Sequence, residues 1–497
     1  MSSSNPNSEQ SKVRRMSGES PQLPPETVET VEEINFDGPN DLFHPHNWPR
    51  AKKLSFIAIV SAKIFVVSFA SSIFGSGTAV LVEEYNAANV VVLLGVSLFV
   101  AGFAVGPLFF GPVSEVVGHT PPMIFGCLVC AILQIPLALA KNMPVILVCR
   151  FLAGVSGSAV LGVGSGMVAE LYEPVPRAVA LGFSASMINV GSTVAPVAGG
   201  YIVDRYGWRW TAWITRFMFL VLEPFACFAL RESSPRQILK ARAKKLRRRG
   251  HGEKRIVAPA DLEVVDTRQL FAKYLTKPVR LFCHEPILIF LTVHLTFVYG
   301  TLYLAYQLVP LALQRRGWSV TSSNLPFVAM TLGTLTAPFI MAAFTLTWYK
   351  KQLFRRGGVT VPEDRLYPMI VGAAILPVSL LWFGWSMSTH WFCQVLAAYF
   401  IGVSVLLIFL SGIIYIVDVY HECANSAISI HVAFRSVFAA SFPIWTGPFY
   451  DALGVEKMSS VLAAVAAILF PVPIVFLIFG KKIRSWSRFI NQSQPNS

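Results

Sequence analysis

The chain has 497 residues, of which 54% are hydrophobic and only 14% are charged. Soluble domains carry about 25% charged residues, so this composition excludes an ordinary soluble enzyme and indicates that lipid surrounds most of the chain. The net charge of +14 would suit nucleic-acid binding only if the basic residues shared one face. They are instead distributed between apolar runs, so no nucleic-acid partner is expected.

Residues 1–47 form a polar N-terminal segment rich in Ser, Pro, Glu and Asn. Such a composition buries too little apolar surface to offset the loss of chain entropy, so a disordered tail is predicted. No short apolar segment with a cleavage site opens the chain, and insertion into the membrane is therefore expected to begin with the first spanning helix.

Twelve apolar runs follow, and each is long enough for a helix that crosses a bilayer, which needs about 20 residues. They lie at about 54–81, 90–112, 121–140, 144–171, 178–203, 209–230, 286–312, 323–348, 366–387, 390–416, 424–449 and 456–480. A polar linker at 231–285 divides them six and six. The predicted fold is therefore an all-α integral membrane protein whose twelve transmembrane helices form two six-helix bundles, residues 48–230 and 286–480, followed by a tail at 481–497. Substrate sites of such duplicated proteins lie between the halves, near the bilayer midplane.

Most of the 41 Lys and Arg residues fall in the N-terminal segment, the linker and alternate loops. Basic residues stay on the cytoplasmic side, so both ends of the chain and the linker are predicted to be cytoplasmic. The basic run at 240–249 then fixes the orientation, and it could also meet anionic lipid headgroups. A multi-pass protein of the cell membrane is expected, with the plasma membrane favoured over the vacuolar one.

A glycine-rich loop joins the second and third spans and places an acid at the cytoplasmic boundary. It reads Gly-Pro-Val-Ser-Glu-Val-Val-Gly from Gly111 to Gly118, with Glu115 as the acid. This resembles the signature loop of the major facilitator superfamily, in the form typical of the twelve-span drug:proton antiporters of fungi. The resemblance implies a conformational gate at these three residues. Where the family continues with basic residues this chain has His119 and Thr120, so a weakly reinforced gate is expected.

Further motifs follow the same family order along the chain. The segment from Gly191 to Gly200 resembles the antiporter motif, with Gly191, Pro196, Gly199 and Gly200 at matching positions. Small residues at this spacing let helix backbones approach closely, and a proline favours a bend. Packing alone explains the pattern, and the alternative is a seam that limits leakage by holding two conformations apart.

Arg150 lies inside the fourth span, in a stretch that resembles the family's span-four motif. An arginine in lipid costs at least a few kcal/mol unless it faces a cavity or a partner. The resemblance makes Arg150 a candidate for proton coupling, acting on the ionisation of a nearby acid, and the alternative is a side chain that reaches the outer headgroups. Lys63 in the first span is either a cavity residue or a similarly extended side chain.

Proton coupling needs a group that binds and releases a proton in turn. Glu223 is the acid furthest inside an apolar run, although Arg216 on the same helix could mask it. His431 in the eleventh span is a second candidate because imidazole titrates near neutrality, and hydrogen-bonded packing is its alternative. Asp418, in a family-like Tyr-x-x-Asp-x-Tyr stretch, and Arg435 are candidates for a gate.

Tyr299, Tyr303 and Tyr306 recur at the i, i+4, i+7 spacing that puts side chains on one helix face. In the superfamily's layout this seventh span lines the central cavity, and an aromatic face suits a planar or bulky apolar substrate. The tryptophans of the second half fit an interfacial belt instead.

These observations favour a proton-coupled transporter that exports small, largely apolar organic compounds by alternating access, functioning as a monomer. The first alternative is a proton symporter for uptake of a nutrient or polyamine, and the second is a non-transporting membrane sensor on the same scaffold. The chain has no Gly-Lys-Ser/Thr phosphate loop, and its seven cysteines lie mostly inside apolar runs without paired metal-ligand spacing. Enzymatic activity, a cofactor, a metal site and disulfides are therefore not expected.

Overall fold

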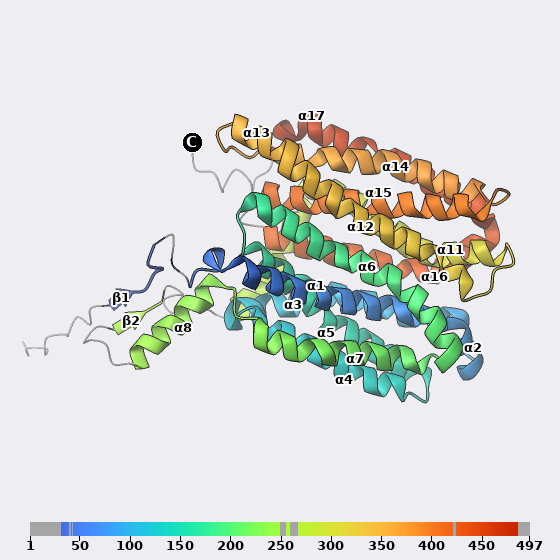
Figure 1. Ribbon diagram of the computed structural model, residues 1–497, viewed down its shortest axis with the longest axis horizontal. Coiled ribbons are helices and arrows are strands. Elements are labelled where there is room, and N and C mark those ends of the chain that lie inside the picture. The colour runs from blue at the N-terminus through green and yellow to red at the C-terminus, as the bar shows by residue number, and fades with distance from the viewer. Residues whose placement is uncertain are drawn as a thin grey trace, which may run out of the picture.

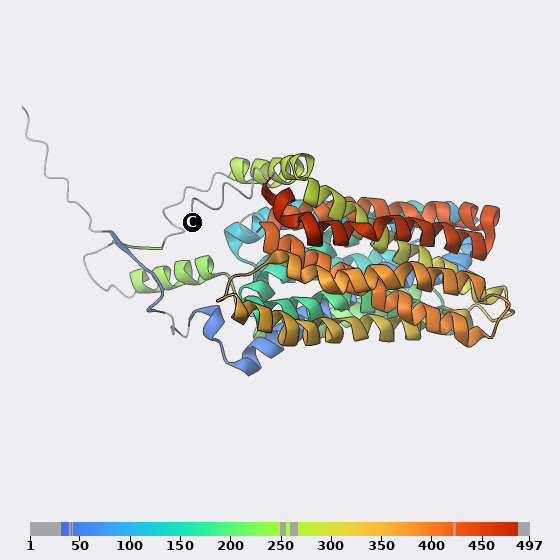
Figure 2. The ribbon, with the colours of Figure 1, turned by 90° about the horizontal axis from the view of Figure 1, so that it is seen from above.

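The computed structural model describes residues 31–38, 41, 43–248, 255–258, 267–420 and 424–485. Long helices run side by side in one bundle, with the first half of the chain lying against the second (Figure 1). The linker and the last helix reach the same end of the bundle as the N-terminal segment (Figures 1 and 2). This is the cytoplasmic end in the predicted orientation.

Helices of the first half begin where the chain leaves the N-terminal segment. Proline stands in the first turn of several of them, where its missing N–H costs no hydrogen bond. The elements are α1 (Arg50–Ile73), η2 (Phe74–Gly77), α2 (Thr78–Tyr85), α3 (Asn89–Val117), α4 (Thr120–Ala138), α5 (Met143–Ala169), α6 (Pro174–Tyr206) and α7 (Arg209–Ala229). Because α1, η2 and α2 continue one another, this half has six spans.

The second half repeats this arrangement. Its elements are α11 (Pro286–Gln314), η3 (Ser322–Asn324), α12 (Pro326–Phe344), the π-helical turn η4 (Thr345–Tyr349), α13 (Lys350–Arg355), η5 (Pro362–Leu366), α14 (Tyr367–Trp385), α15 (Trp391–Tyr420), α16 (Ala424–Leu469) and α17 (Pro471–Ser485). The halves meet where α3 packs against α16 and α6 packs against α12.

Eleven helical stretches among the described residues are long and apolar enough to cross a membrane. The last, Ser426–Ser485, has 60 residues, more than twice the length that one crossing needs. It contains Gly454 at φ 70° and ψ 178°, a backbone conformation outside the helical region and open to glycine. The stretch therefore holds two spans, and the total is twelve.

The cytoplasmic segments differ from the predicted disordered tail and plain linker. Strand β1 (Val31–Glu33) pairs in parallel with β2 (Arg255–Val257), and the linker also forms α8 (Pro235–Arg248) and α10 (Thr267–His284). The short helix η1 (Pro45–Asn47) then leads into α1. The tail is thus ordered over its described residues, whereas residues 1–30 and 486–497 of the two predicted tails lie outside the described part.

A small apolar cluster explains why this part of the tail folds. Ile34 and Phe36 pack against Leu239 and Ala243 of the amphipathic helix α8. Arg242 of the same helix forms ion pairs with Asp37 and Asp41. The tail alone buries too little surface, but the linker supplies the second face, which a local composition argument cannot detect.

Candidate substrate and coupling sites

The three tyrosines of α11 form one continuous aromatic face, as their spacing predicts. The rings of Tyr299 and Tyr303 are 5.1 Å apart and those of Tyr303 and Tyr306 are 5.5 Å apart. The Tyr299 and Tyr303 hydroxyls are 3.4 Å apart. Further rings extend the face at both ends, since Phe409 of α15 stacks on Tyr299 and Phe327 of α12 meets Tyr306 edge-on.

This face lies at the boundary between the halves. Tyr303 contacts Ser71 of α1, and Tyr306 contacts Ser192 of α6. Nearby, Thr331 of α12 donates a hydrogen bond to Thr193 of α6 at 2.8 Å. At this part of the interface, small polar side chains of the first half therefore face aromatic and hydroxyl groups of the second.

Arg435 lies in the middle of the membrane-spanning region, against the tyrosine face. Its guanidinium carbon is 4.1 Å from the Tyr299 ring centre and 4.9 Å from that of Phe409. The side chain is buried, and its Nε and Nη1 have no hydrogen-bond acceptor among the described residues. Eleven helical residues of α16 separate Arg435 from the cytoplasmic start of that helix, so Arg435 lies deeper in the bundle than Asp418, the other gate candidate of the second half. A gate role of Arg435 stays a prediction.

His431 lies one helical turn before Arg435 and is fully buried. Neither ring nitrogen has a hydrogen-bond partner among the described residues. The alternative of hydrogen-bonded packing is therefore not what the structure shows, while a role of His431 in proton coupling stays a prediction.

Arg150 binds backbone carbonyl groups of two other helices. Its Nε donates to the Gly95 carbonyl of α3 at 2.8 Å, and its Nη1 and Nη2 donate to Ala70 and Ser71 of α1, each at 2.7 Å. Only 1% of the residue is exposed, so the side chain does not extend to the headgroups. Arg150 fastens α5 to α1 and α3.

The acidic partner expected for Arg150 is not found. No carboxylate contacts its guanidinium among the described residues, and its flat faces meet the rings of Phe74 and Phe99 instead. The carbonyls satisfy the charge because a guanidinium presents several N–H donors in a fixed plane. In this structure Arg150 therefore holds three helices together, and its role in proton coupling stays a prediction.

Glu223 of α7 forms an ion pair with Lys63 of α1. Lys63 Nζ is 3.0 Å from one carboxylate oxygen and 3.1 Å from the other. Both residues are buried, and the Cys127 thiol of α4 contacts the same carboxylate. Arg216, the expected masking partner, lies over the ring of Trp213 instead. Both charges are candidates by sequence, but their pairing has no local signature because 160 positions separate them.

Asp418, at the cytoplasmic end of α15, accepts a hydrogen bond from Arg365 Nε at 2.9 Å. The guanidinium of Arg365 also lies 3.5 Å from the ring centre of Tyr349. The expected basic partner of Asp418 thus exists, but η5 supplies it from the same half. The pair braces the start of α14 against α15.

The loop after α3 is held by Glu170 of the first half and Glu232 of the linker. Gly118 has φ 103°, which ends α3. His119 Nε2 lies 3.1 Å from the Glu170 carboxylate, and the backbone N–H groups of His119 and Thr120 donate to Glu232 at 2.9 and 3.1 Å. Burial acts to lower the pKa of His119, but the carboxylates of Glu170, Glu232 and Glu115 together outweigh it, and the pKa lies above its ordinary value of 6.5.

Gly111 and Glu115 occupy the end of α3 that faces the linker. The main-chain oxygen of Glu115 accepts a hydrogen bond from Gln237 of α8. Gly111 lines a cavity of about 80 Å³ that α3 and α5 share with α16. Residues of α16 on this cavity are Ile428, Ser429 and Val432. A gate role of Gly111, Glu115 and Gly118 stays a prediction.

The antiporter-like segment of α6 packs closely on its neighbours. A Cβ atom at Gly191 would clash with the Phe65 carbonyl of α1, and one at Gly199 would clash with Ser76 of η2. Gly200 approaches Asn324 of the second half. Pro196 lies inside α6, between Gly191 and Gly199. The geometry supports the packing role, and the seam function stays a prediction.

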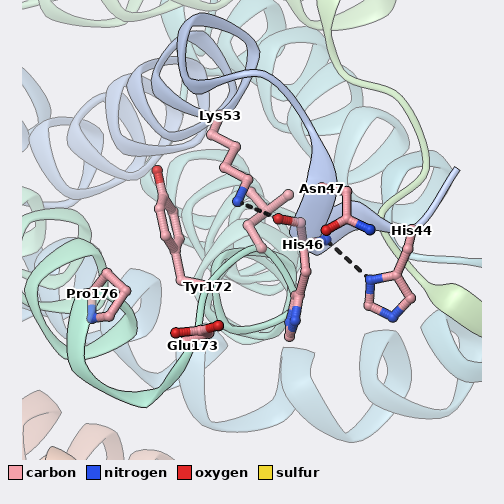
Figure 3. Close-up of a pocket in the computed structure, with 8 residues that line it drawn as sticks. His44, His46, Asn47, Lys53, Tyr172, Glu173 and Pro176 are labelled. Carbon is pink, nitrogen blue, oxygen red and sulfur yellow. Dashed lines mark hydrogen bonds between the residues drawn. The ribbon is translucent and has the colours of Figure 1, made fainter. Parts of the chain in front are cut away.

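A larger cavity of about 440 Å³ lies outside the helix bundle interface, at its cytoplasmic end. Figure 3 shows Lys53 of α1 pointing toward His46 of η1, with Tyr172 and Glu173 on the facing loop. Lys53 Nζ donates to the His46 carbonyl at 2.8 Å. This cavity has no local sequence signature, since η1 and the loop reach it from distant parts of the chain. Among the described residues, no group of three or more His, Cys, Asp or Glu could hold a metal ion.

The chain is similar to known transporters over nearly its whole length. The family model described as the Major Facilitator Superfamily matches residues 62–443. The MFS-type transporter traF of Penicillium crustosum is 38% identical over 461 residues, covering 92% of this chain and 93% of the relative. The citrinin biosynthesis cluster MFS transporter mrr1 of Monascus ruber is 37% identical over 481 residues, covering 95% and 94%. The ascochitine biosynthesis cluster MFS transporter of Didymella fabae is 38% identical over 464 residues, covering 92% and 89%.

Among solved structures, the proton:xylose symporter XylE superposes with a TM-score of 0.63 at 16% identity, covering 88% of this chain and 96% of that one. At this identity the likeness shows the fold alone. The chain belongs to the major facilitator superfamily, and it is a multi-pass membrane transporter. The predicted superfamily and the twelve-helix fold are confirmed.

Proposed function

We propose that the protein exports small, largely apolar organic compounds in exchange for protons, by alternating access, from the plasma membrane. The aromatic face of α11 carries this proposal, because Tyr299, Tyr303 and Tyr306 present stacked rings where the two halves meet. Such rings suit planar or bulky apolar substrates. The similarity to transporters of citrinin and ascochitine biosynthesis clusters supports secondary metabolites as the class of compound.

In this proposal Glu223 carries the proton. Its ion pair with Lys63 links α7 to α1 in a water-poor interior. Protonation of the carboxylate removes the ion pair, and a buried ammonium left without its partner is costly. The preferred packing of α1 against α7 then differs between the two protonation states, which is the property that coupling requires. His431 is the second candidate for a titrating group.

The cytoplasmic contacts supply the conformational control. The Asp418–Arg365 pair keeps the ends of α14 and α15 together, and His119–Glu170 does the same for α4 and α5. Each half then moves as a rigid unit about the α3–α16 and α6–α12 contacts. Both halves belong to one chain, so a monomer suffices for transport.

The deciding experiment uses inside-out plasma-membrane vesicles from transporter-depleted yeast that express the full chain. Aromatic secondary metabolites are offered with and without an imposed gradient, acidic inside. If the protein is an exporter, the metabolite should accumulate inside the vesicles only with the pH gradient. The Glu223→Gln variant should lose this accumulation. Accumulation only with the gradient reversed would establish symport instead. Substrate binding without flux under either gradient would indicate a sensor.

A further inference from the structure

The buried cations of the bundle differ in how their charge is satisfied. Lys63 has Glu223, Arg150 has three backbone carbonyls, and Arg365 has Asp418. Arg435 has no acid within ion-pair distance among the described residues, and two of its nitrogens, Nε and Nη1, lack any acceptor there. It is therefore the one of these four cations whose charge the surrounding protein leaves uncompensated.

This arrangement is costly without a further partner. A buried donor with no acceptor costs about 1–3 kcal/mol, and more when it is charged. The rings of Tyr299 and Phe409 attract the guanidinium, and a desolvated cation–π contact contributes about 2 kcal/mol or more, but the rings give Nε and Nη1 no hydrogen-bond acceptor. An anionic oxygen atom placed at the free N–H groups would offset the remainder.

His431 strengthens the case from the same helix face. Residues four apart on a helix are neighbours, and His431 is fully buried with both ring nitrogens unpartnered among the described residues. An imidazole N–H can donate to the same anion that Arg435 binds. Two donors with no protein acceptor therefore lie side by side.

Two aromatic rings and the cavity of about 80 Å³ lie next to these donors. Tyr299 and Phe409 stack with their ring centres 6.4 Å apart, and the guanidinium carbon of Arg435 lies within 5 Å of both. The cavity shared by α3, α5 and α16 reaches Val432, one turn of α16 before Arg435. The cavity therefore ends about one helical turn from the cation.

We propose that the transported compounds are aromatic organic acids, whose carboxylate or enolate oxygen atoms bind Arg435 and His431 while the ring system packs on Tyr299 and Phe409. A guanidinium group matches a carboxylate in a planar, paired geometry. This inference rests on the proposed transport function and narrows its substrate class from apolar compounds to acidic ones.

Binding to the purified full-length protein in detergent tests the inference without a need for flux. The probes are 1-hydroxy-2-naphthoate, its neutral methyl ester, and a naphthylmethyl trimethylammonium cation, compared by titration calorimetry at neutral pH. We expect the acid to bind at least tenfold more tightly than the ester, and the cation not to bind. Arg435→Gln should remove the preference for the acid, while Arg435→Lys should keep part of it.

Arg315→Gln is the matched control, because Arg315 also lies over a tyrosine ring, 4.6 Å from that of Tyr450, but at the C-terminal end of α11, away from Tyr299. Arg315→Gln should leave binding of the acid unchanged. Equal binding of acid and ester, no binding of the acid, or a preference retained in Arg435→Gln would overturn the inference. Thermal unfolding is measured for each variant, with Arg435→Lys as the conservative substitution. A variant that unfolds like the wild type but does not prefer the acid has lost the site and not the fold.

Failure of this inference can be distinguished from failure of the proposed function. Gradient-driven export of the neutral ester, with no binding of the acid, would leave export standing and remove the acidic substrate class. Selective binding of the acid with flux that ignores the pH gradient would support the substrate class and remove proton exchange.

Discussion

Lys63 of α1 and Glu223 of α7 form a buried ion pair with an N–O distance of 3.0 Å, although 160 positions separate them in the chain. The pair joins the first and the sixth span of one half. The carboxylate also contacts the Cys127 thiol of α4, so three helices meet at this charge. A titrating group at such a junction can change how the helices pack.

The ion pair gives the first prediction. Glu223→Gln leaves Lys63 as an unpaired buried charge, and breaking a buried pair costs about 3–5 kcal/mol. The double variant Lys63→Met/Glu223→Met removes both charges and should recover most of that stability. Thermal unfolding in detergent measures this difference. Gradient-driven flux should be lost in both variants, and normal pH-dependent flux in the double variant would show that the proton is carried elsewhere.

Arg150 gives the second prediction. Arg150→Lys should lower the free energy of unfolding by roughly 3 kcal/mol, because one ammonium group cannot replace donors to three carbonyls on two helices and each charged hydrogen bond contributes about 1.5–3 kcal/mol. Arg150→Ala should lose more. Chemical denaturation in detergent gives the values. Arg209→Lys is a control because that arginine is partly exposed and pairs with Glu84. An undiminished stability of Arg150→Lys would contradict the assigned role.

His119 predicts a pH dependence of stability. Its pKa is raised in the folded protein, so the stabilisation is fully present below the ordinary value of 6.5 and is lost as pH rises through the raised value. The wild type should exceed His119→Gln in thermal stability at pH 6 by about 1 kcal/mol or less. That difference should shrink by pH 8. His119→Arg should keep the contact with Glu170 at both pH values, and a difference that grows with pH would refute the pairing.

The linker helix α8 gives the last prediction. Arg242→Ala removes the ion pairs with Asp37 and Asp41 and should release residues 31–38 from α8. Hydrogen exchange of that segment should accelerate at least tenfold. Lys244→Ala, an exposed position on the same helix, is the control. Unchanged protection in Arg242→Ala would mean that the apolar contacts of Ile34 and Phe36 hold the segment without the charges.

Much of the architecture was predictable from local sequence. Each span is marked by its own apolar run, because a helix in lipid needs only a continuous stretch of about 20 apolar residues. The aromatic face of α11 was predictable for a similar reason, since the helical repeat alone puts Tyr299, Tyr303 and Tyr306 on one side. The glycines of α6 also predicted a closely packed helix, although they did not identify α1 as its partner.

The pairing of charges was decided only by the tertiary structure. Neither the carbonyl partners of Arg150 nor the link from Lys63 to Glu223 has a local signature, because each joins helices that become neighbours only when the bundle assembles. Arg435 was assigned to a gate from its motif, whereas the packing of α16 against α11 places it on the tyrosine face. The N-terminal segment was assigned to disorder because its own composition is polar, and it is ordered over its described residues because α8 supplies the apolar surface that it lacks. Sequence determined which segments lie in lipid, since that depends on each segment's own side chains, and the fold determined which charges meet, since that depends on neighbours far away in the chain.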